Sequence, residues 1–334
     1  MKIFITGIAG FLGSHLADAM LAEGHEVVGN DTLIGGYRDN VPKQAQLHLV
    51  DCNDLEKMTE LMKGVDIVYH TACTAYEGLS VFSPKLVCEN TYLNTVSTAT
   101  AAIRNHVRRF VTCSSMARYG TQDTVPFTED MVCRPQDPYG ISKFAAEQQL
   151  KCLCEVHGME LVIAVPHNII GPRQKYDDPF RNVASIMINL MLQGRQPVIY
   201  GDGEQKRCFS FVQDDIDCLK KLAFLECAAG ETVNIGPDEE FITINRLAET
   251  LAELLDFKLD PVYMPGRPQE VRLATCSAQK ARRLLGYETK YTLKQGLSEM
   301  IAYIRERGTK PFTYHLPIEI LSEKTPKTWS DRLF

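Results

Sequence analysis

The sequence of 334 residues predicts an α/β fold in which a doubly wound parallel sheet carries a smaller lobe of mixed α/β structure. Short β-branched runs alternate with longer helical patterns through the first half of the chain. A glycine-rich turn follows the first run, and an acidic residue follows the second. Such alternation is typical of a Rossmann-like sheet with helices on both faces, whose ligands bind at the carboxyl ends of the strands.

The expected elements follow in order along the chain. Helical spacing of apolar residues occupies segments 12–20, 55–62 and 84–105, and it recurs near 244–255 and 277–285. We therefore expect a sheet domain over residues 1–171, with a return segment near 208–245. Residues 172–334 are expected to form mainly the lobe and a C-terminal tail. The expected strands are Lys2–Thr6, Glu26–Gly29, Leu47–Val50, Ile67–His70, Phe110–Ser114 and Glu160–Val165.

The composition narrows the classes of partner. The chain has 36 basic against 42 acidic side chains, a formal net charge of −6, and no block of basic residues. Neither nucleic acid nor an anionic membrane surface is therefore expected as a partner. No stretch approaches the ~20 apolar residues of a membrane span, and the N-terminus lacks a signal-peptide pattern. Eleven scattered cysteines without a C-x-x-C pair indicate reduced thiols in the cytoplasm and no metal site.

The glycine-rich turn at residues 6–13 has the spacing of a dinucleotide site. Gly7, Gly10 and Gly13 permit a tight turn, close approach to a pyrophosphate and close packing of helix on strand. Asp31 follows about twenty residues on, where a carboxylate can bind the adenosine ribose. Because that carboxylate would repel a 2′-phosphate, NAD is favoured over NADP, and residues 1–171 are expected to bind it. The alternative is an ordinary glycine-containing loop, and Asp51 is either an adenine contact or a surface turn residue.

A tyrosine and a lysine supply a candidate general base. Tyr139 and Lys143 lie four residues apart at the start of a predicted helix, so they share one face. The pKa of a free tyrosine is about 10, but a neighbouring ammonium and a cationic nicotinamide both favour the phenolate. Ser115 follows the fifth strand and could hold the reacting hydroxyl. Ser114 is the alternative, since serines after strands are also common turn formers.

Further segments extend this pattern: Asn90, Asn168 to Arg173, Gly201 to Gly203 before Arg207, Arg267 to Glu270, and Lys280 with Ala281. With the glycine turn and the Tyr/Lys pair, they resemble the extended short-chain dehydrogenase/reductase family over nearly the whole chain. Within it, the resemblance is to NAD-dependent nucleotide-sugar epimerases and dehydratases, in particular to UDP-glucose and UDP-N-acetylglucosamine 4-epimerases. The resemblance implies NAD, a nucleoside-diphosphate sugar and a homodimer, formed through apolar faces that include Leu93, Val96, Ala99, Ala102, Phe144, Ala145 and Leu150.

The resemblance also implies roles for single positions. Asn168 matches an asparagine that binds the sugar nucleotide, and Arg207 and Arg267 match arginines that contact its diphosphate, for which guanidinium groups are suited. Ala274 stands where a tyrosine restricts related epimerases to unmodified hexoses, so its small side chain implies room for a 2-acetamido group. The expected cofactor site is Gly7, Gly10, Phe11, Leu12, Gly13, Asp31, Asp51, Cys52, Asn90, Tyr139 and Lys143. The expected substrate site is Ser115, Met116, Asn168, Arg207, Arg267 and Ala274.

The residues after Ser115 separate reaction types within the family. Met116 and Ala117 replace the Asp and Glu that eliminate water in 4,6-dehydratases, and Ala117 also lacks the Glu or Cys of related decarboxylases and 3,5-epimerases. Ser115, Tyr139 and Lys143 with NAD remain, which are enough to oxidise a sugar C4 hydroxyl and reduce it again. The expected reaction is 4-epimerisation of a UDP-hexose or UDP-N-acetylhexosamine through a transient 4-keto sugar. The alternatives are a nucleotide-sugar dehydratase or C4 oxidase, and an idle NAD-binding sensor or scaffold.

Several residues depart from the common family pattern. Met116 and Arg118 stand where small or aliphatic residues are usual, and Met116 either packs over the sugar or indicates another substrate or a less usual dehydration. His167 lies close in sequence to Asn168, but such a histidine is more often a core residue than a catalytic one. The tail from 310 to 334 holds the only tryptophan, Trp329, and is expected to pack on its own or a neighbouring subunit.

Overall fold

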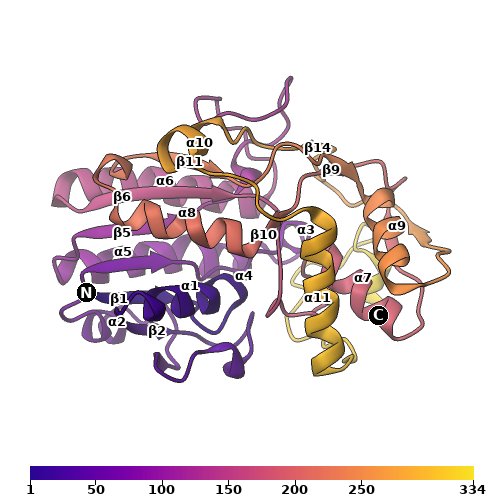
Figure 1. The fold of residues 1–334 in the computed structure, drawn as a ribbon, viewed down its shortest axis with the longest axis horizontal. Coiled ribbons are helices and arrows are strands. Elements are labelled where there is room, and N and C mark those ends of the chain that lie inside the picture. The colour runs from indigo at the N-terminus through magenta and orange to yellow at the C-terminus, as the bar shows by residue number, and fades with distance from the viewer.

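The computed structural model describes residues 1–334, and a seven-stranded parallel sheet lies at its centre (Figure 1). The strand order is β11-β6-β5-β4-β1-β2-β3: from β1 the chain adds β2 and β3 on one side and then β4, β5, β6 and β11 on the other, so the order reverses between β1 and β4. Ligands of such sheets bind beside this reversal, at the carboxyl ends of the strands. The predicted fold class is confirmed. The strands are β1 (Lys2–Thr6), β2 (Glu26–Asn30), β3 (Gln46–His48), β4 (Ile67–His70), β5 (Arg109–Cys113), β6 (Glu160–Pro166) and β11 (Thr232–Ile235).

Helices cover both faces of the sheet. Because strand side chains alternate between faces, Ile3 and Ile5 of β1 point to one core and Phe4 points to the other. The first core is closed by α1 (Phe11–Ala22), α8 (Val212–Phe224) and α10 (Gln279–Leu285). The second is closed by α2 (Leu55–Leu61), α5 (Asn94–Arg104) and α6 (Pro138–His157). The short helical turns are η1 (Arg38–Asn40), η3 (Met116–Arg118) and η4 (Glu226–Ala228).

The long helical pattern at 84–105 contains an irregular turn. It comprises α4 (Pro84–Cys88), a π-helical turn η2 (Glu89–Leu93) and α5. Ala99 and Ala102 of α5 and Leu150 of α6 lie in the monomer's own core, because α5 packs between α2 and α6. The expectation that these three residues belong to an intersubunit face is therefore wrong. Leu93 is 45% exposed and remains available to a partner.

The lobe has its own core, which lies beside the carboxyl ends of the sheet strands. Its helices are α7 (Val183–Leu192), α9 (Ile244–Leu255) and α11 (Leu293–Arg307). In contrast to the expected boundary, α10 packs on the sheet through Ala281 and Leu285. The small strand pairs are β7 (Ile169–Ile170) with β10 (Ser210–Phe211), β8 (Val198–Tyr200) with β13 (Val262–Met264), and β9 (Lys206–Arg207) with β12 (Ile242–Thr243) and β14 (Leu273–Ala274).

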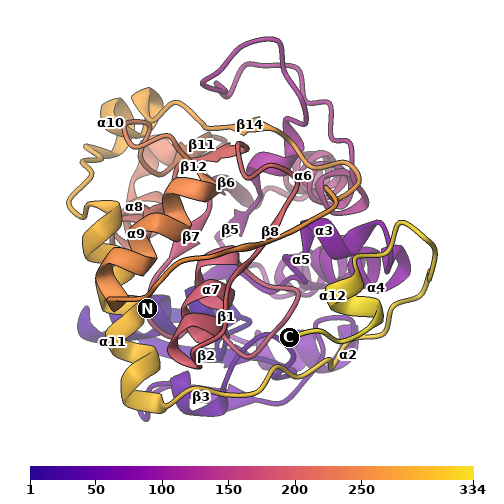
Figure 2. The same cartoon turned by 90° about the vertical axis from the view of Figure 1, so that its right-hand side faces the viewer.

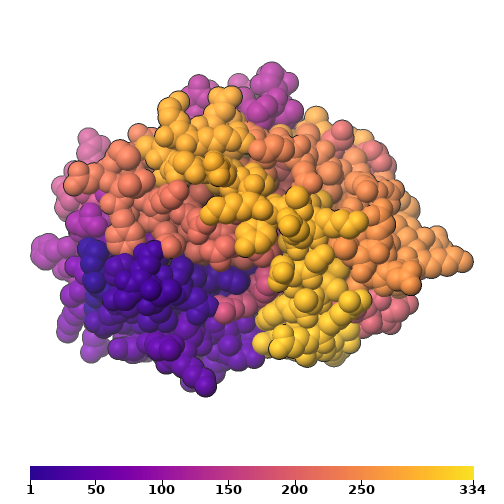
Figure 3. All heavy atoms as spheres, in the orientation of Figure 1, coloured from indigo at the N-terminus to yellow at the C-terminus, as the bar shows by residue number.

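The C-terminal tail packs on its own subunit. It carries α12 (Lys327–Ser330), which lies near α3 (Glu77–Ser80) and α4 (Figure 2). The indole of Trp329 is 3% exposed, packs with Tyr76, Phe82 and Phe180, and donates to the carbonyl oxygen of Pro179 at 3.1 Å. In Figure 3, indigo N-terminal segments gather on the left of the molecule and yellow C-terminal segments on the right. None of the helices is both long and apolar enough to cross a membrane.

Candidate active site

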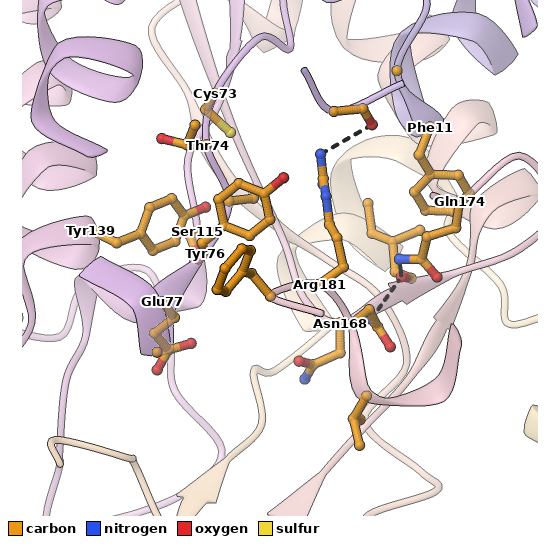
Figure 4. Close-up of a pocket in the computed structure, with 18 of the residues that line it drawn as sticks. Phe11, Cys73, Thr74, Tyr76, Glu77, Ser115, Tyr139, Asn168, Gln174 and Arg181 are labelled. Carbon is orange, nitrogen blue, oxygen red and sulfur yellow. Dashed lines mark hydrogen bonds between the residues drawn. The ribbon is translucent and has the colours of Figure 1, made fainter. Parts of the chain in front are cut away.

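The candidate active site is a cavity of about 440 Å³ bounded by the carboxyl ends of the sheet strands and by the lobe (Figure 4). This volume is in the range of small-molecule sites. Met116 and Ala274 are the two predicted site residues that do not line it. The predicted residues that do line it are Gly7, Gly10, Phe11, Leu12, Gly13, Asp31, Asp51, Cys52, Asn90, Ser115, Tyr139, Lys143, Asn168, Arg207 and Arg267.

The glycine turn forms a cradle that side chains would fill. Gly7 has a left-handed φ of +68°, and a Cβ on Gly13 would lie 2.3 Å from the Gly7 carbonyl oxygen. Asp31 stands beside this turn, where its carboxylate accepts hydrogen bonds from the amides of Ala9 at 2.9 Å and Leu33 at 2.7 Å. Burial raises the pKa of Asp31, although these amide bonds oppose the rise. The turn, the start of α1 and the oriented carboxylate together fit a dinucleotide.

A second glycine loop, which the sequence analysis missed, completes the cofactor end. A Cβ on Gly36 would lie 2.1 Å from the carbonyl oxygen of Ala9, and one on Gly35 would lie 2.2 Å from the Arg181 guanidinium. Arg181 donates to the carbonyl oxygen of Gly35 at 3.1 Å and lies over the ring of Tyr76 (Figure 4). The adjacent glycines were the available signal for this loop, whereas nothing local marked Arg181.

The three predicted catalytic residues meet at one wall of the cavity. Asp137 caps α6 by accepting from the amide of Gly140 at 2.9 Å, which places Tyr139 and Lys143 in the first turns of the helix. Ser115 caps η3 by accepting from the amide of Ala117 at 3.2 Å. Tyr139 and Ser115 lie together in Figure 4, and Ser115 is close enough to lower the pKa of Tyr139. One wall therefore carries a phenol, a hydroxyl and an ammonium.

Burial dominates the electrostatics of Tyr139. It raises the pKa of Tyr139 well above 10, and the nearby Cys73 adds to the rise, which Ser115 opposes. The Lys143 ammonium lies 5.9 Å from the centroid of the Tyr139 ring and donates to the carbonyl oxygen of Cys113 at 2.8 Å. That the lysine and a cationic nicotinamide together favour the phenolate stays a prediction.

The role of Arg118, which the sequence left open, is structural. Its guanidinium forms an ion pair with Glu147 at 3.0 Å, and both side chains are almost fully buried. Glu147 also accepts a hydrogen bond from Ser114, so that hydroxyl is occupied and Ser115 is the better catalytic candidate. The pair joins η3 to α6, and it thereby holds Ser115 and Tyr139 at a fixed separation.

The far end of the cavity carries the predicted diphosphate arginines. Arg267 lies 2.9 Å from the Glu270 carboxylate, and Arg207 lies 3.7 Å from it. The Arg267 guanidinium also covers the ring of Tyr200, with 5.0 Å between the guanidinium carbon and the ring centroid. Asn168 donates to the carbonyl oxygen of Cys208 at 3.0 Å and has a φ of +45°, a backbone conformation that asparagine tolerates better than most residues.

Comparison with known proteins agrees with this geometry. The model of the NAD dependent epimerase/dehydratase family matches residues 3–236. The chain belongs to this family. A UDP-glucose 4-epimerase from Mycolicibacterium smegmatis is 30% identical over 319 residues, which are 92% of this chain and all of that protein. The protein is thus an enzyme of the epimerase/dehydratase family, and its cofactor is NAD.

Solved structures of the family superimpose on nearly the whole fold. The Thermotoga maritima UDP-glucose 4-epimerase with UDP-glucose has a TM-score of 0.86 and 30% identity, covering 92% of this chain and 99% of its own. The Bacillus cereus UDP-glucuronic acid 4-epimerase with UDP-glucuronic acid and NAD has a TM-score of 0.86 and 26% identity, covering 92% and 100%. Family members with this fold therefore act on neutral and on acidic sugars.

Three residues that depart from the family pattern lie behind the cavity wall. Met116 is 9% exposed and packs in the core, with its sulfur 3.6 Å from the Asn168 amide nitrogen. Ala274 pairs with Arg207 across β14 and β9, but its methyl is buried in the same core as Met116. His167 is buried, contacts the carbonyl oxygen of Pro237 at 2.8 Å, and has a pKa lowered by burial. The cavity wall therefore gives no support to a substrate role for Ala274 or Met116.

Proposed function

We propose that the enzyme catalyses 4-epimerisation of a UDP-hexose or UDP-N-acetylhexosamine through a transient 4-keto sugar. The observation that carries this proposal is the neighbouring pair of Ser115 and Tyr139, in one cavity with the glycine turn and two arginines. Ala117, where related dehydratases carry an acid–base residue, is 4% exposed and does not line the cavity. This arrangement supports oxidation and reduction at one carbon better than elimination.

The chain's own residues account for proton transfer and binding. Tyr139 as phenolate takes the proton of the sugar C4 hydroxyl, which Ser115 holds by a hydrogen bond, and later returns it. The glycine turn and Asp31 would hold NAD, which when bound would supply the hydride acceptor and donor for C4 and a positive charge that favours the phenolate. Arg207 and Arg267 hold the diphosphate while the keto sugar turns over, so that the opposite face is reduced.

The proposal is tested by replacing the hydroxyl of Tyr139. Tyr139→Phe should reduce kcat about 10²- to 10⁴-fold, the usual contribution of a general acid–base, with NAD still bound. Tyr291→Phe is the matched control, because Tyr291 stacks on Phe211 outside the cavity lining and should retain full activity. Conversion of UDP-glucose and UDP-N-acetylglucosamine is followed by NMR. Near-normal turnover by Tyr139→Phe would refute the mechanism.

We also propose a homodimer formed through the exposed side of η2 and α6. Leu93 is 45% exposed and Ile141 is 51% exposed, and the elements that carry them are in contact. Large exposed apolar side chains on two contacting elements favour a protein partner. A cytoplasmic location is proposed from the eleven cysteines, all of which are free thiols.

A further inference from the structure

Glu77 is an acidic residue of the cavity to which the proposed reaction assigns no role. It is the first residue of α3, which follows β4 at the same sheet edge as Ser115. Its side chain is exposed, but it lines the cavity (Figure 4). The Ser80 hydroxyl donates to its backbone carbonyl oxygen, whereas the carboxylate accepts no hydrogen bond from a protein group and forms no ion pair. The carboxylate is therefore free to accept hydrogen bonds from a ligand in the cavity.

Two contacts fix Glu77 between the ends of the substrate site. The Ser80 hydroxyl lies 3.3 Å from the carboxylate of Asp137, the cap of the helix that carries Tyr139. On the other side, a Cβ on Gly78 would lie 3.0 Å from the Arg267 guanidinium. The helix α3 therefore touches both the support of the catalytic tyrosine and a diphosphate arginine. Glu77 is thereby placed to face a sugar that extends from the diphosphate arginines to Tyr139.

The electrostatics of Glu77 agree with this position. The side chain of Glu77 faces the open cavity, but the protein around it partly desolvates the carboxyl and thereby raises its pKa; Asp137 adds to the rise, and Arg207 and Arg267 oppose it. The charge of Glu77 in turn raises the pKa of Tyr139. Glu77 is thus coupled to both ends of the space where the sugar lies.

We propose that Glu77 binds the sugar ring through its hydroxyl groups and excludes nucleotide sugars that carry a carboxylate, such as UDP-glucuronic acid. This inference rests on the proposed function and names its substrate class as neutral UDP-sugars. At this end of the cavity the charges of Arg207 and Arg267 are already balanced by those of Glu77 and Glu270. A diphosphate adds two negative charges, so a uronate would bring a further anion close to Glu77 without compensation.

The test compares kcat/KM for UDP-glucose and UDP-glucuronic acid in the NAD-loaded enzyme. The wild type should prefer UDP-glucose by at least about tenfold, the discrimination expected from one uncompensated like-charge contact. Glu77→Gln should reduce this preference about tenfold or more, since the amide removes the charge and keeps the shape. Glu77→Asp should keep the preference, because it keeps the charge. Glu56→Gln, which changes an 81%-exposed carboxylate on α2, is the matched control and should leave both values unchanged.

Binding of UDP alone, measured by calorimetry, separates recognition from misfolding. Its Kd in Glu77→Gln should be no weaker than in wild type, because the arginines remain in place and the amide removes a negative charge near the diphosphate. An unchanged sugar preference in Glu77→Gln, or a wild type that uses both sugars equally, would overturn the inference. If the wild type epimerised none of UDP-glucose, UDP-N-acetylglucosamine and UDP-glucuronic acid, the proposed function would fail. The inference would then be decided by the same comparison made on Kd values, where Glu77→Gln must strengthen UDP-glucuronic acid binding relative to UDP-glucose.

Discussion

The buried ion pair of Arg118 and Glu147 makes a sharp prediction about stability. The two side chains are 4% and 2% exposed and lie 3.0 Å apart. Burial raises the pKa of Glu147 against the opposing effect of Arg118, whereas the pKa of Arg118 is raised despite its burial because Glu147, Tyr119 and Cys133 together outweigh desolvation. The raised pKa of Glu147 favours a neutral carboxyl, whereas the raised pKa of Arg118 favours a charged guanidinium. The 3.0 Å distance between the two side chains shows that the ionised pair is the relevant state. We therefore change Glu147→Leu.

The magnitude follows from the partner that is left behind. Without Glu147, the guanidinium of Arg118 has no carboxylate partner, and the rings of Tyr119 and Phe144 lie 5.2 and 5.8 Å from it, measured to their centroids. Removing one member of a buried pair costs about 3–5 kcal/mol of the free energy of unfolding, whereas replacing both members by apolar residues is often neutral or stabilising. Arg118→Met with Glu147→Leu should thus be more stable than either single variant.

Urea denaturation of the NAD-loaded protein measures these differences, provided that the free energy of unfolding falls with urea concentration at the same slope in all variants. Arg104→Met with Glu56→Leu, a pair with 44% and 81% exposed side chains, is the matched surface control and should change stability by less than about 1 kcal/mol. A double variant that loses the sum of the two single losses would refute the reasoning, because the charges would then not be coupled.

Two further predictions concern the cofactor turn and the response to acid. Gly13→Ala places a Cβ 2.3 Å from the Gly7 carbonyl oxygen. The resulting strain of ~1–3 kcal/mol should weaken NAD binding about 5- to 150-fold. The control Gly24→Ala, whose Cβ would have nothing within 4 Å, should leave the Kd for NAD unchanged, and equal Kd values for the two variants would contradict the prediction. Burial lowers the pKa of His70 to about 3 from 6.5. The unfolded chain therefore takes up a proton below pH 6.5 that the folded protein refuses, so stability should fall by about 1.4 kcal/mol per pH unit between there and pH 3. His70→Asn should lack this slope in urea titrations, and an identical slope in both proteins would count against it.

The parts of the site that could be predicted from sequence are those set by local spacing. The glycine turn works because three glycines fall within one strand-to-helix connection, and Tyr139 and Lys143 share a face because four residues separate them on a helix. Each of these geometries is contained in a few consecutive residues. That is why the cofactor turn and the catalytic wall were found without a structure.

The parts that could not be predicted depend on tertiary contacts. Glu77 belongs to no recognisable sequence motif. It lines the cavity because α3 packs between Asp137 and Arg267. Ala274 was assigned by counting from Arg267, but strand pairing places its methyl in the core. The pKa of Tyr139 depends on desolvation, which spacing along the chain does not reveal.

The most direct test of the central claim is product analysis with the purified NAD-loaded enzyme and UDP-glucose or UDP-N-acetylglucosamine. The account predicts a product of unchanged mass whose NMR spectrum shows inversion at C4 alone, with no net formation of NADH. A product that has lost one water, or a keto sugar released together with an equal amount of NADH, would contradict it.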